Sequence, residues 1–214
     1  MTNTISKIVK TLIISDFFLN LGWGLLAPVF AIFILQNIVA DNALKAAEVA
    51  GFAALCYWIT KSFLEIPIGH FLDKNHGEKD DFWFMVIGTL LTAVVPIGFL
   101  FSSLPWHIYF FQVIHAVGMA MTLPSWLAIF TRHIDKGREA FEWGMETTSI
   151  GMGAGIAGGF GGVMASIVGF KALFIFVSLF TIFSGLLLLL VKNNISARNK
   201  EVIRISTEKP VIEP

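Results

Sequence analysis

Charged residues are scarce in this 214-residue chain. Only 14% of its residues are Asp, Glu, Lys or Arg, whereas soluble domains carry about 25%. Positive and negative charges are equal in number, at 15 each, so no basic excess favours nucleic acid as a partner. Because 56% of the residues are hydrophobic, the composition indicates that a lipid bilayer is the solvent.

Cysteine is almost absent as well. Cys56 is the single one, and it lies within an apolar run, where we interpret it as a small buried hydrophobe. One cysteine excludes a disulfide within the chain and a cysteine metal cluster. We find no nucleophile triad, no phosphate-binding loop and no histidine pair with metal spacing. We therefore expect no enzyme, no cofactor and no bound metal.

The strands of a membrane β-barrel, in which apolar and polar residues alternate, are also missing. The apolar residues instead form six continuous runs, each long enough for a helix to cross a bilayer, which takes about 20 residues. The first run exceeds the signal-peptide core of about 7–15 residues, so we interpret it as a retained span. The predicted spans are 12–37, 47–71, 82–102, 106–131, 142–168 and 171–191.

The predicted fold class is therefore an all-α membrane protein of six transmembrane helices. The bundle occupies residues 1–192, and residues 193–214 form a polar cytoplasmic tail that we expect to be disordered. The starting Met and the charged tail favour a complete small protein over a fragment.

Lysine and arginine residues are distributed unevenly around these spans. Twelve of the fifteen flank the spans on one side, Lys45 and Lys171 lie on the other, and Lys61 lies within a span. Because cytoplasmic loops carry the excess of Lys and Arg, both termini are predicted to be cytoplasmic. We expect the chain to lie in the plasma (inner) membrane of a prokaryote.

Four of the six spans carry polar side chains in pairs spaced three or four residues apart. Residues with this spacing share one face of a helix. A charge near the bilayer centre costs at least about 2.5–3.5 kcal/mol, so we expect these faces to point into a protein interior or a wet cavity. The pairs are Asp16 with Asn20, Lys61 with Glu65, Gln112 with His115, and Glu142 with Glu146.

The third span and the segment 172–191 carry no charged residue and are expected to face lipid. The order of the spans is therefore polar, polar, plain, and then the same again. This order predicts a 3+3 inverted repeat, a plan that occurs in transporters.

The segment after the second span, GHFLDKNHGEK at 69–79, resembles the loop signature of the major facilitator superfamily, G-x-x-x-D-[RK]-x-G-[RK]-[RK]. One extra residue separates Lys74 from Gly77, and Glu78 stands where a basic residue is usual. In that family the loop secures one half of the protein against the other. The resemblance implies a gate latch at Gly69, Asp73, Lys74 and Gly77. We expect the span to end near Gly69, and Gly69 and Gly77 to form a hinge.

The fifth span resembles the family's antiporter signature, G-x8-G-x3-G-P-x2-G-G. Gly144, Gly153, Gly161 and Gly162 fall in register, and Ala157-Gly158 replaces the usual Gly-Pro. A span with many glycines lets another backbone approach closely. Ordinary helix packing within one bundle is the alternative interpretation.

The fourth span, FFQVIHAVGMAMTLPSW, resembles the family's R-x-x-Q-G signature. Gln112 stands where Arg is usual and His115 where Gln is usual. That Arg is associated with proton coupling in the family. The whole resemblance covers roughly residues 10–192.

Members of that family normally have twelve spans in two halves, and this chain has one half. Both of its termini lie on one side, so two copies can sit side by side in the same orientation. We therefore expect a homodimer with one central cavity lined by two copies of each polar residue. A heterodimer with a second half-length chain is the alternative.

Several of the cavity candidates have two interpretations. Lys61 and Glu65 form either a structural pair that reaches toward the cytoplasm or a pair that exchanges partners with solute or proton. Asp16 is either a helix-start acid or a cavity residue beside Asn20. Glu146 is the preferred protonatable carboxylate, with a hydrogen-bonded packing role as the alternative. His115 either is structural or binds solute with Gln112. Trp23, Trp58 and Trp126 lie within spans and can line a cavity.

These patterns favour a secondary active transporter of a small solute that works by alternating access, with proton-coupled antiport as one form. The expected partners are lipid, a second copy of the chain or another half-transporter, a solute and protons. The rival is a non-transporting membrane subunit or receptor that keeps the fold.

Overall fold

A computed structural model of the chain describes residues 5–75 and 78–192. Gly77 of the predicted latch and the predicted tail 193–214 lie outside the described residues. The described part is entirely helical apart from its connections and contains no strand. The helices are α1 (Lys7–Leu26), α2 (Phe30–Asn37), α3 (Ala43–Asn75), α4 (Glu78–Leu100), α5 (Pro105–His133) and α6 (Glu139–Leu189).

The first predicted span, 12–37, is two helices rather than one. Helix α1 ends at Leu26 and α2 begins at Phe30. Pro28 lies in the interruption, where it has no N–H to continue the helical ladder. The prediction of one continuous helix over this segment is therefore wrong, because the helix is interrupted at Pro28.

Helix α3 is longer than the predicted span 47–71. It begins at Ala43, where the Asn42 side chain accepts the Lys45 N–H at 3.0 Å, as an N-cap does. It continues through Gly69 to Asn75, so the predicted end near Gly69 is wrong. Lys74 lies in the last turn of α3, where its positive charge interacts favourably with the negative end of the helix dipole and supports this later helix end.

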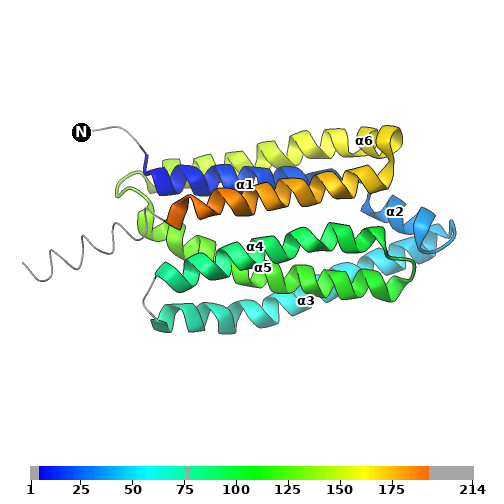
Figure 1. Cartoon of the computed structure of the whole chain (residues 1–214), viewed down its shortest axis with the longest axis horizontal. Helices are drawn as coiled ribbons and strands as arrows, with labels where there is room; N and C mark the ends of the chain where they lie inside the picture. Colours follow the sequence, from blue (N-terminus) through cyan, green and yellow to red (C-terminus); the bar gives the residue numbers. More distant parts are fainter. Residues whose placement is uncertain (1–4, 76–77, 193–214) are drawn as a thin grey trace, which may run out of the picture.

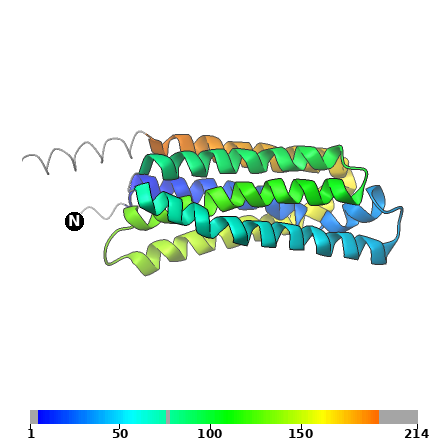
Figure 2. The ribbon, with the colours of Figure 1, turned by 90° about the horizontal axis from the view of Figure 1, so that it is seen from below.

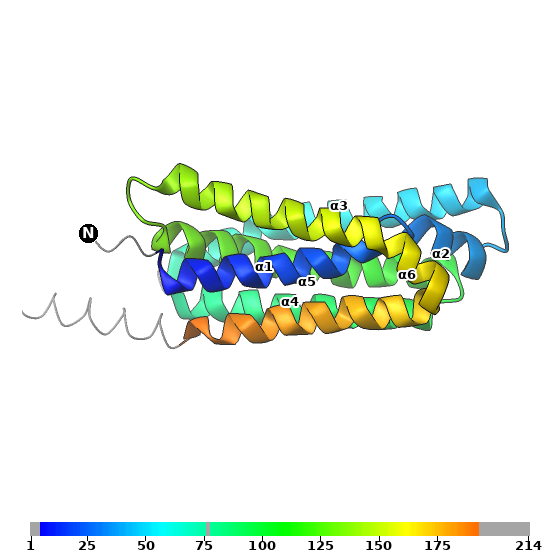
Figure 3. The ribbon, with the colours of Figure 1, turned by 90° about the horizontal axis from the view of Figure 1, so that it is seen from above.

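Helix α6 contains the fifth and sixth predicted spans as two limbs, 139–168 and 170–189. The limbs meet at Gly169, whose φ of 77° and ψ of 168° break the helix. An L side chain rarely adopts this φ, which explains a glycine at the reversal. The limbs run antiparallel after this turn (Figures 1 and 3), so the predicted tight connection at 169–171 is confirmed.

Helix α1 lies between the two limbs of α6, as Figure 3 shows. A Cβ on Gly22 would meet Phe180 and Val177 of the second limb at 3.1 Å. A Cβ on Gly24 would meet Ala154 and Ala157 of the first limb at about 3 Å or less. Small residues on α1 therefore allow both limbs to approach it.

Helices α3, α4 and α5 form the other side of the bundle. Helix α5 packs against both α3 and α4, and α4 also packs against α6. The Ser178 hydroxyl of the second limb donates to the Ala93 carbonyl of α4 at 2.7 Å, which ties the two sides together. In this arrangement α3 is the least covered of the long helices, with only 17% of its most apolar window buried.

The connections alternate between two ends of the bundle. The start of α1, the end of α3, the start of α4, the α5–α6 connection and the end of α6 lie at one end, called the terminal end below (Figures 1 and 2). The turns near Lys45 and Lys171 lie at the opposite end. Five helices of the described part, α1, α3, α4, α5 and α6, are long and apolar enough to cross a bilayer by length and composition.

Candidate functional site

The predicted cavity residues separate into three places. The carboxylate site contains Asp16, with Asn20 beside it, and Glu146. The aromatic site contains Gln112 and His115. The third place is the Lys61–Glu65 pair on α3. Each is described in turn.

The carboxylate site joins α1, α5 and the first limb of α6. Asp16 and Glu146 line one cavity of about 140 Å³, and their carboxyl groups lie close enough to interact directly. Glu146 is 2% exposed, and no donor group of the described residues hydrogen-bonds its carboxyl oxygens, whose polar neighbour is the Asp16 carboxyl. Two adjacent carboxylates in a buried site repel each other, so the site favours a shared proton or a bound cation.

Two further side chains complete the carboxylate site. The Asn20 amide donates to the Asp16 main-chain carbonyl at 2.9 Å and to its Oδ2 at 3.2 Å, which holds the carboxyl in place. Trp126 lines the same cavity, and its buried indole N–H has no partner in the described part of the chain. The predicted pairing of Asp16 with Asn20 on one helix face agrees with these hydrogen bonds.

Glu142, one turn before Glu146, serves a different purpose. It is fully buried in the first turn of α6, where it accepts the Asp135 N–H at 3.3 Å. It therefore stabilises the loop before α6, as a helix-start acid does, and does not line the carboxylate cavity.

The aromatic site lies between α1, α3 and α5. His115 Nδ1 and Gln112 Oε1 are 3.4 Å apart, and the His115 ring stacks on Trp23 with centroids 3.7 Å apart at an interplanar angle of 5°. The Tyr57 ring lies 4.7 Å from His115. These residues line a cavity of about 240 Å³ together with Leu26, Ala27, Phe30, Ala54 and Trp58. Sequence reasoning missed Tyr57, which joins the site only through helix packing.

The Lys61–Glu65 pair forms within α3, with Nζ and Oε2 2.9 Å apart. Lys61 is 7% exposed, and its ammonium lies 5.5 Å from the centre of the Trp58 ring. Neither residue lines the two cavities described above. The pair therefore neutralises its own charge on the helix that the bundle covers least.

The predicted latch residues lie at the terminal end. Gly69 is inside the continuous α3, and a Cβ there would make only an ordinary contact, 3.9 Å from Pro124. The backbone at Gly69 is helical in this structure, and the hinge there stays a prediction. Asp73 and Lys74 occupy the last turns of α3, and Asp73 interacts electrostatically with Asp81 of α4.

A charged network at the same end was not predicted. Asp81, whose side chain is fully buried, pairs with Arg132 of α5, and His133 Nε2 lies 3.0 Å from Glu78 Oε1. The acids stand at the start of α4 and the bases at the end of the antiparallel α5, where each suits the helix dipole. Acidic residues at the start of one predicted helix and basic residues at the end of the next could have predicted this network from the sequence.

The four glycines of the predicted packing motif differ in their surroundings. A Cβ on Gly153 would lie 2.9 Å from the Phe17 carbonyl oxygen, and one on Gly161 only 2.2 Å from that of Leu25. Gly144 and Gly162 have open space within 4 Å of such a Cβ. Gly153 and Gly161 therefore allow α1 to approach closely, whereas Gly144 and Gly162 face open space.

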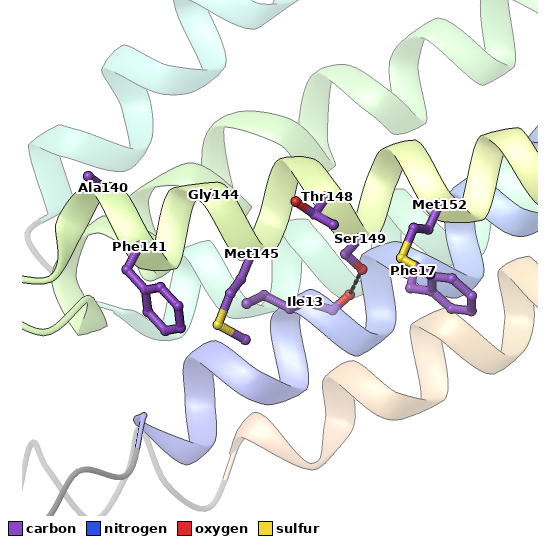
Figure 4. Close-up of a pocket in the computed structure, with 9 residues that line it drawn as sticks. All are labelled: Ile13, Phe17, Ala140, Phe141, Gly144, Met145, Thr148, Ser149 and Met152. Atoms are coloured by element: carbon purple, nitrogen blue, oxygen red, sulfur yellow. Dashed lines mark hydrogen bonds between the residues drawn. The ribbon is translucent and has the colours of Figure 1, made fainter.

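A larger cavity of about 600 Å³ lies between α1 and the first limb of α6 (Figure 4). Gly144 lines it, and the Ser149 hydroxyl donates across it to the Ile13 carbonyl at 3.3 Å. Its side chains are apolar or uncharged, including Phe17, Phe141, Met145 and Met152. The cavity contains no titratable group, so the polar chemistry of the bundle lies in the smaller carboxylate and aromatic sites.

These features define a class: an integral, multi-pass α-helical membrane protein with polar groups held inside an apolar bundle. The sequence profile of the Major Facilitator Superfamily matches residues 12–213. The chain belongs to this superfamily.

A curated relative agrees with the family. An uncharacterized MFS-type transporter from the archaeon Methanocaldococcus jannaschii is 26% identical over 202 residues. The match covers 94% of this chain and 50% of the relative. The chain therefore spans about half the length of the curated relative it matches.

Proposed function

We propose that the chain is a secondary active transporter that moves a small solute across the membrane by alternating access. The observation that carries this proposal is the carboxylate site. Glu146 is buried beside Asp16 inside a membrane bundle, and no donor among the described groups hydrogen-bonds its carboxyl oxygens, so the Asp16 carboxyl is its polar neighbour. Burying such a group is costly, and intramembrane ionisable residues generally mark ion or substrate pathways.

The coupling ion we propose is the proton, in an antiport cycle. One proton between Asp16 and Glu146 removes the repulsion of two carboxylates, and its loss restores that repulsion. The protonated and deprotonated states therefore differ in how well they tolerate burial. Such a difference lets protonation bias one conformation of a transporter over another.

We further propose that the fold makes six membrane crossings, with α1 and α2 together forming the first and the limbs of α6 the last two. The packing supports an inverted 3+3 repeat, since α1 packs on both limbs of α6 as α5 packs on α3 and α4. The terminal end carries most of the described Lys and Arg residues, so it is the cytoplasmic side of a prokaryotic plasma membrane.

A homodimer completes the proposal. The chain spans about half the length of its curated relative, and we propose that a second copy of the bundle supplies the other half of a central pathway. Two faces of the bundle are available for it. Helix α3 exposes Trp58, Phe63 and Ile66, and the first limb of α6 exposes glycines with open space around them. A two-fold axis along the membrane normal brings both faces of each copy together.

The terminal-end charges are proposed to form the gate latch. Asp73 and Lys74 end α3 beside the buried Asp81–Arg132 pair, so the latch residues adjoin a fixed charged network. We expect Asp73→Asn to slow transport and to leave assembly unchanged. Unchanged transport by that variant in reconstituted vesicles would remove the latch role. Lys61 and Glu65 are proposed to exchange partners in the cycle, with a structural pair as the alternative.

The test of transport uses sealed vesicles that contain the full chain and a pH-sensitive dye. Panels of small solutes are added outside, and proton flux is recorded. We expect at least one solute class to drive flux that is lost in Glu146→Gln. The matched control is Glu48→Gln, which removes a half-exposed acid at the opposite end and should retain flux. Proton flux that survives Glu146→Gln would overturn the role of Glu146 in coupling, and no proton flux with any solute of the panel would favour a non-transporting subunit.

The test of assembly is the mass of the particle in lipid discs at several protein concentrations. A mass of two chains supports the homodimer. A monomer at every concentration would overturn it, and one chain bound to a different six-span protein would indicate the heterodimer.

A further inference from the structure

The aromatic site has the walls of a binding pocket for flat molecules. Trp23 and His115 are stacked in parallel, and Tyr57 and Trp58 contact each other edge to face with centroids 5.1 Å apart. All four rings line the same cavity of about 240 Å³. Aromatic rings prefer offset-stacked or edge-to-face partners, so these walls are suited to another planar ring system.

The site also offers a hydrogen-bond donor that the protein leaves unused. The Trp23 indole N–H is buried and has no acceptor among the described residues. The Nε1 atom is closed to solvent in this arrangement, so a ligand acceptor reaches it once the lining side chains shift, and that hydrogen bond would recover the cost of about 1–3 kcal/mol of a buried donor without an acceptor. Beside the stacked rings, Gln112 Oε1 lies 3.4 Å from His115 Nδ1, so these two atoms are engaged with each other.

The charge of the lining restricts the ligand further. No Asp, Glu, Lys or Arg lines the cavity. Lys61 lies near Trp58, but Glu65 neutralises it at 2.9 Å. Because an ion in this setting would lack a counter-charge, the site favours a neutral molecule. The volume lies below the roughly 300 Å³ at which ordinary ligand pockets begin, so the molecule is small.

Trp58, which lines the cavity, is 59% exposed on α3, so the lining reaches the surface of the bundle at this side chain. Since α3 is the helix that the bundle leaves most open, a molecule can enter from the side that faces the proposed second copy. The carboxylate site lies deeper toward the terminal end, as Asp16 precedes Trp23 by about two turns of α1. The two cavities share α1 and α5 but no lining residue.

We propose that the aromatic site binds a small, neutral, planar aromatic solute that accepts a hydrogen bond from the Trp23 indole N–H. This inference rests on the proposed transport function, because it names the class of solute that the transporter takes. The stack of Trp23 on His115 supplies the platform, and Gln112 holds the His115 ring in its plane.

The experiment measures equilibrium binding of two radiolabelled probes to the full chain in lipid discs, with empty discs to correct for partitioning. Quinoline is planar and carries one acceptor nitrogen. Naphthalene has the same shape and no acceptor. We expect saturable binding of both probes, and quinoline should bind about tenfold more tightly because it satisfies one buried donor.

Two variants separate the platform from the donor. Trp23→Phe keeps a ring and removes the N–H, so it should abolish the preference for quinoline and leave naphthalene binding unchanged. Trp23→Ala should weaken both probes. Trp83→Phe is the matched control, because Trp83 lies at the start of α4, away from the cavity, and should change neither. Elution volume and helicity confirm that each variant is folded.

The outcomes distinguish this inference from the proposed function. Absence of saturable binding, or a quinoline preference that survives Trp23→Phe, would overturn the inference even if Glu146-dependent proton flux with another solute persists. Saturable, Trp23-dependent binding without any proton flux would support the site and remove the proposed transport.

Discussion

The first limb of α6 has two faces made from similar residues with opposite surroundings. On one face Gly153, Ala157 and Gly161 are buried against α1, close enough for backbone contact. On the other face Gly151, Gly155 and Gly159 are exposed, with open space within 4 Å of any added Cβ. The packed face holds one bundle together, and the open face remains available to another helix.

This difference separates two structural roles of a glycine-rich span. Both close packing within a bundle and packing against a second copy use small residues. In this chain the two uses fall on opposite faces of one limb, so substitutions can test them independently.

Gly161→Ala should break the packed face. The new Cβ would lie 2.2 Å from the Leu25 carbonyl oxygen, and a backbone atom cannot move away as a flexible side chain can. We expect a loss of about 3 kcal/mol in unfolding free energy, measured by denaturant titration in mild detergent. Its neighbour Gly162 has open space, so Gly162→Ala should be neutral or slightly stabilising. Equal effects at the two positions would contradict the assignment of the faces.

Gly24→Ala tests the same contact from α1. Its Cβ would lie 2.9 Å from the Ala157 Cβ and about as close to Ala154. A destabilisation of about 1–2 kcal/mol is expected from this overlap. Adding Ala157→Gly should restore only part of the loss, because the Ala154 contact remains. Full recovery would mean that Ala154 does not limit the approach of the helices.

Gly155→Leu tests the open face. Gly155 is exposed and an added Cβ has no atom within 4 Å, so the side chain can extend away from its own bundle and the unfolding free energy of the monomer should stay within about 0.5 kcal/mol. If a second copy packs on this face, dimer dissociation should become about tenfold easier, measured as monomer fraction against protein concentration in lipid discs. Unchanged dimerisation would place the interface elsewhere, with α3 as the remaining exposed face.

Ser149→Ala removes the hydroxyl that donates to the Ile13 carbonyl at 3.3 Å beside the large cavity. Hydrogen bonds between membrane helices contribute about 0.6 kcal/mol on average, so the melting temperature should fall only slightly. The exposed Ser166, which bonds within its own helix, provides the matched control as Ser166→Ala. A loss of more than about 2 kcal/mol in unfolding free energy for Ser149→Ala would show that this hydrogen bond contributes more than an ordinary one between membrane helices.

Much of the fold followed from apolar run lengths. The long helices and the connection at 169–171 were predicted, because one span takes about 20 apolar residues and a run of about 50 has to be divided. The division at Pro28 was missed because the apolar run continues through it. The helix end at Gly69 was misplaced because a glycine inside a helix costs only about 1 kcal/mol, which packing overrides.

The sequence predicted individual residues of the candidate sites but not how these residues come together in space. The sequence named Asp16 and Glu146 separately but could not place them in one cavity, because they lie on helices far apart in the chain. It named Gln112 and His115 through their spacing, yet their contact with Trp23 and Tyr57 needs three helices. Asp81 and Arg132 were not among the predicted site residues, and their pairing is seen only in the fold.

By itself the sequence determined that this chain is a helical membrane protein of the major facilitator type, because hydropathy and short motifs are read along one helix at a time. The tertiary structure alone decided which glycines face α1, which carboxyl groups meet and which aromatic rings enclose a cavity. The physical reason is that these contacts depend on how helices rotate and cross, which close packing sets and local periodicity does not.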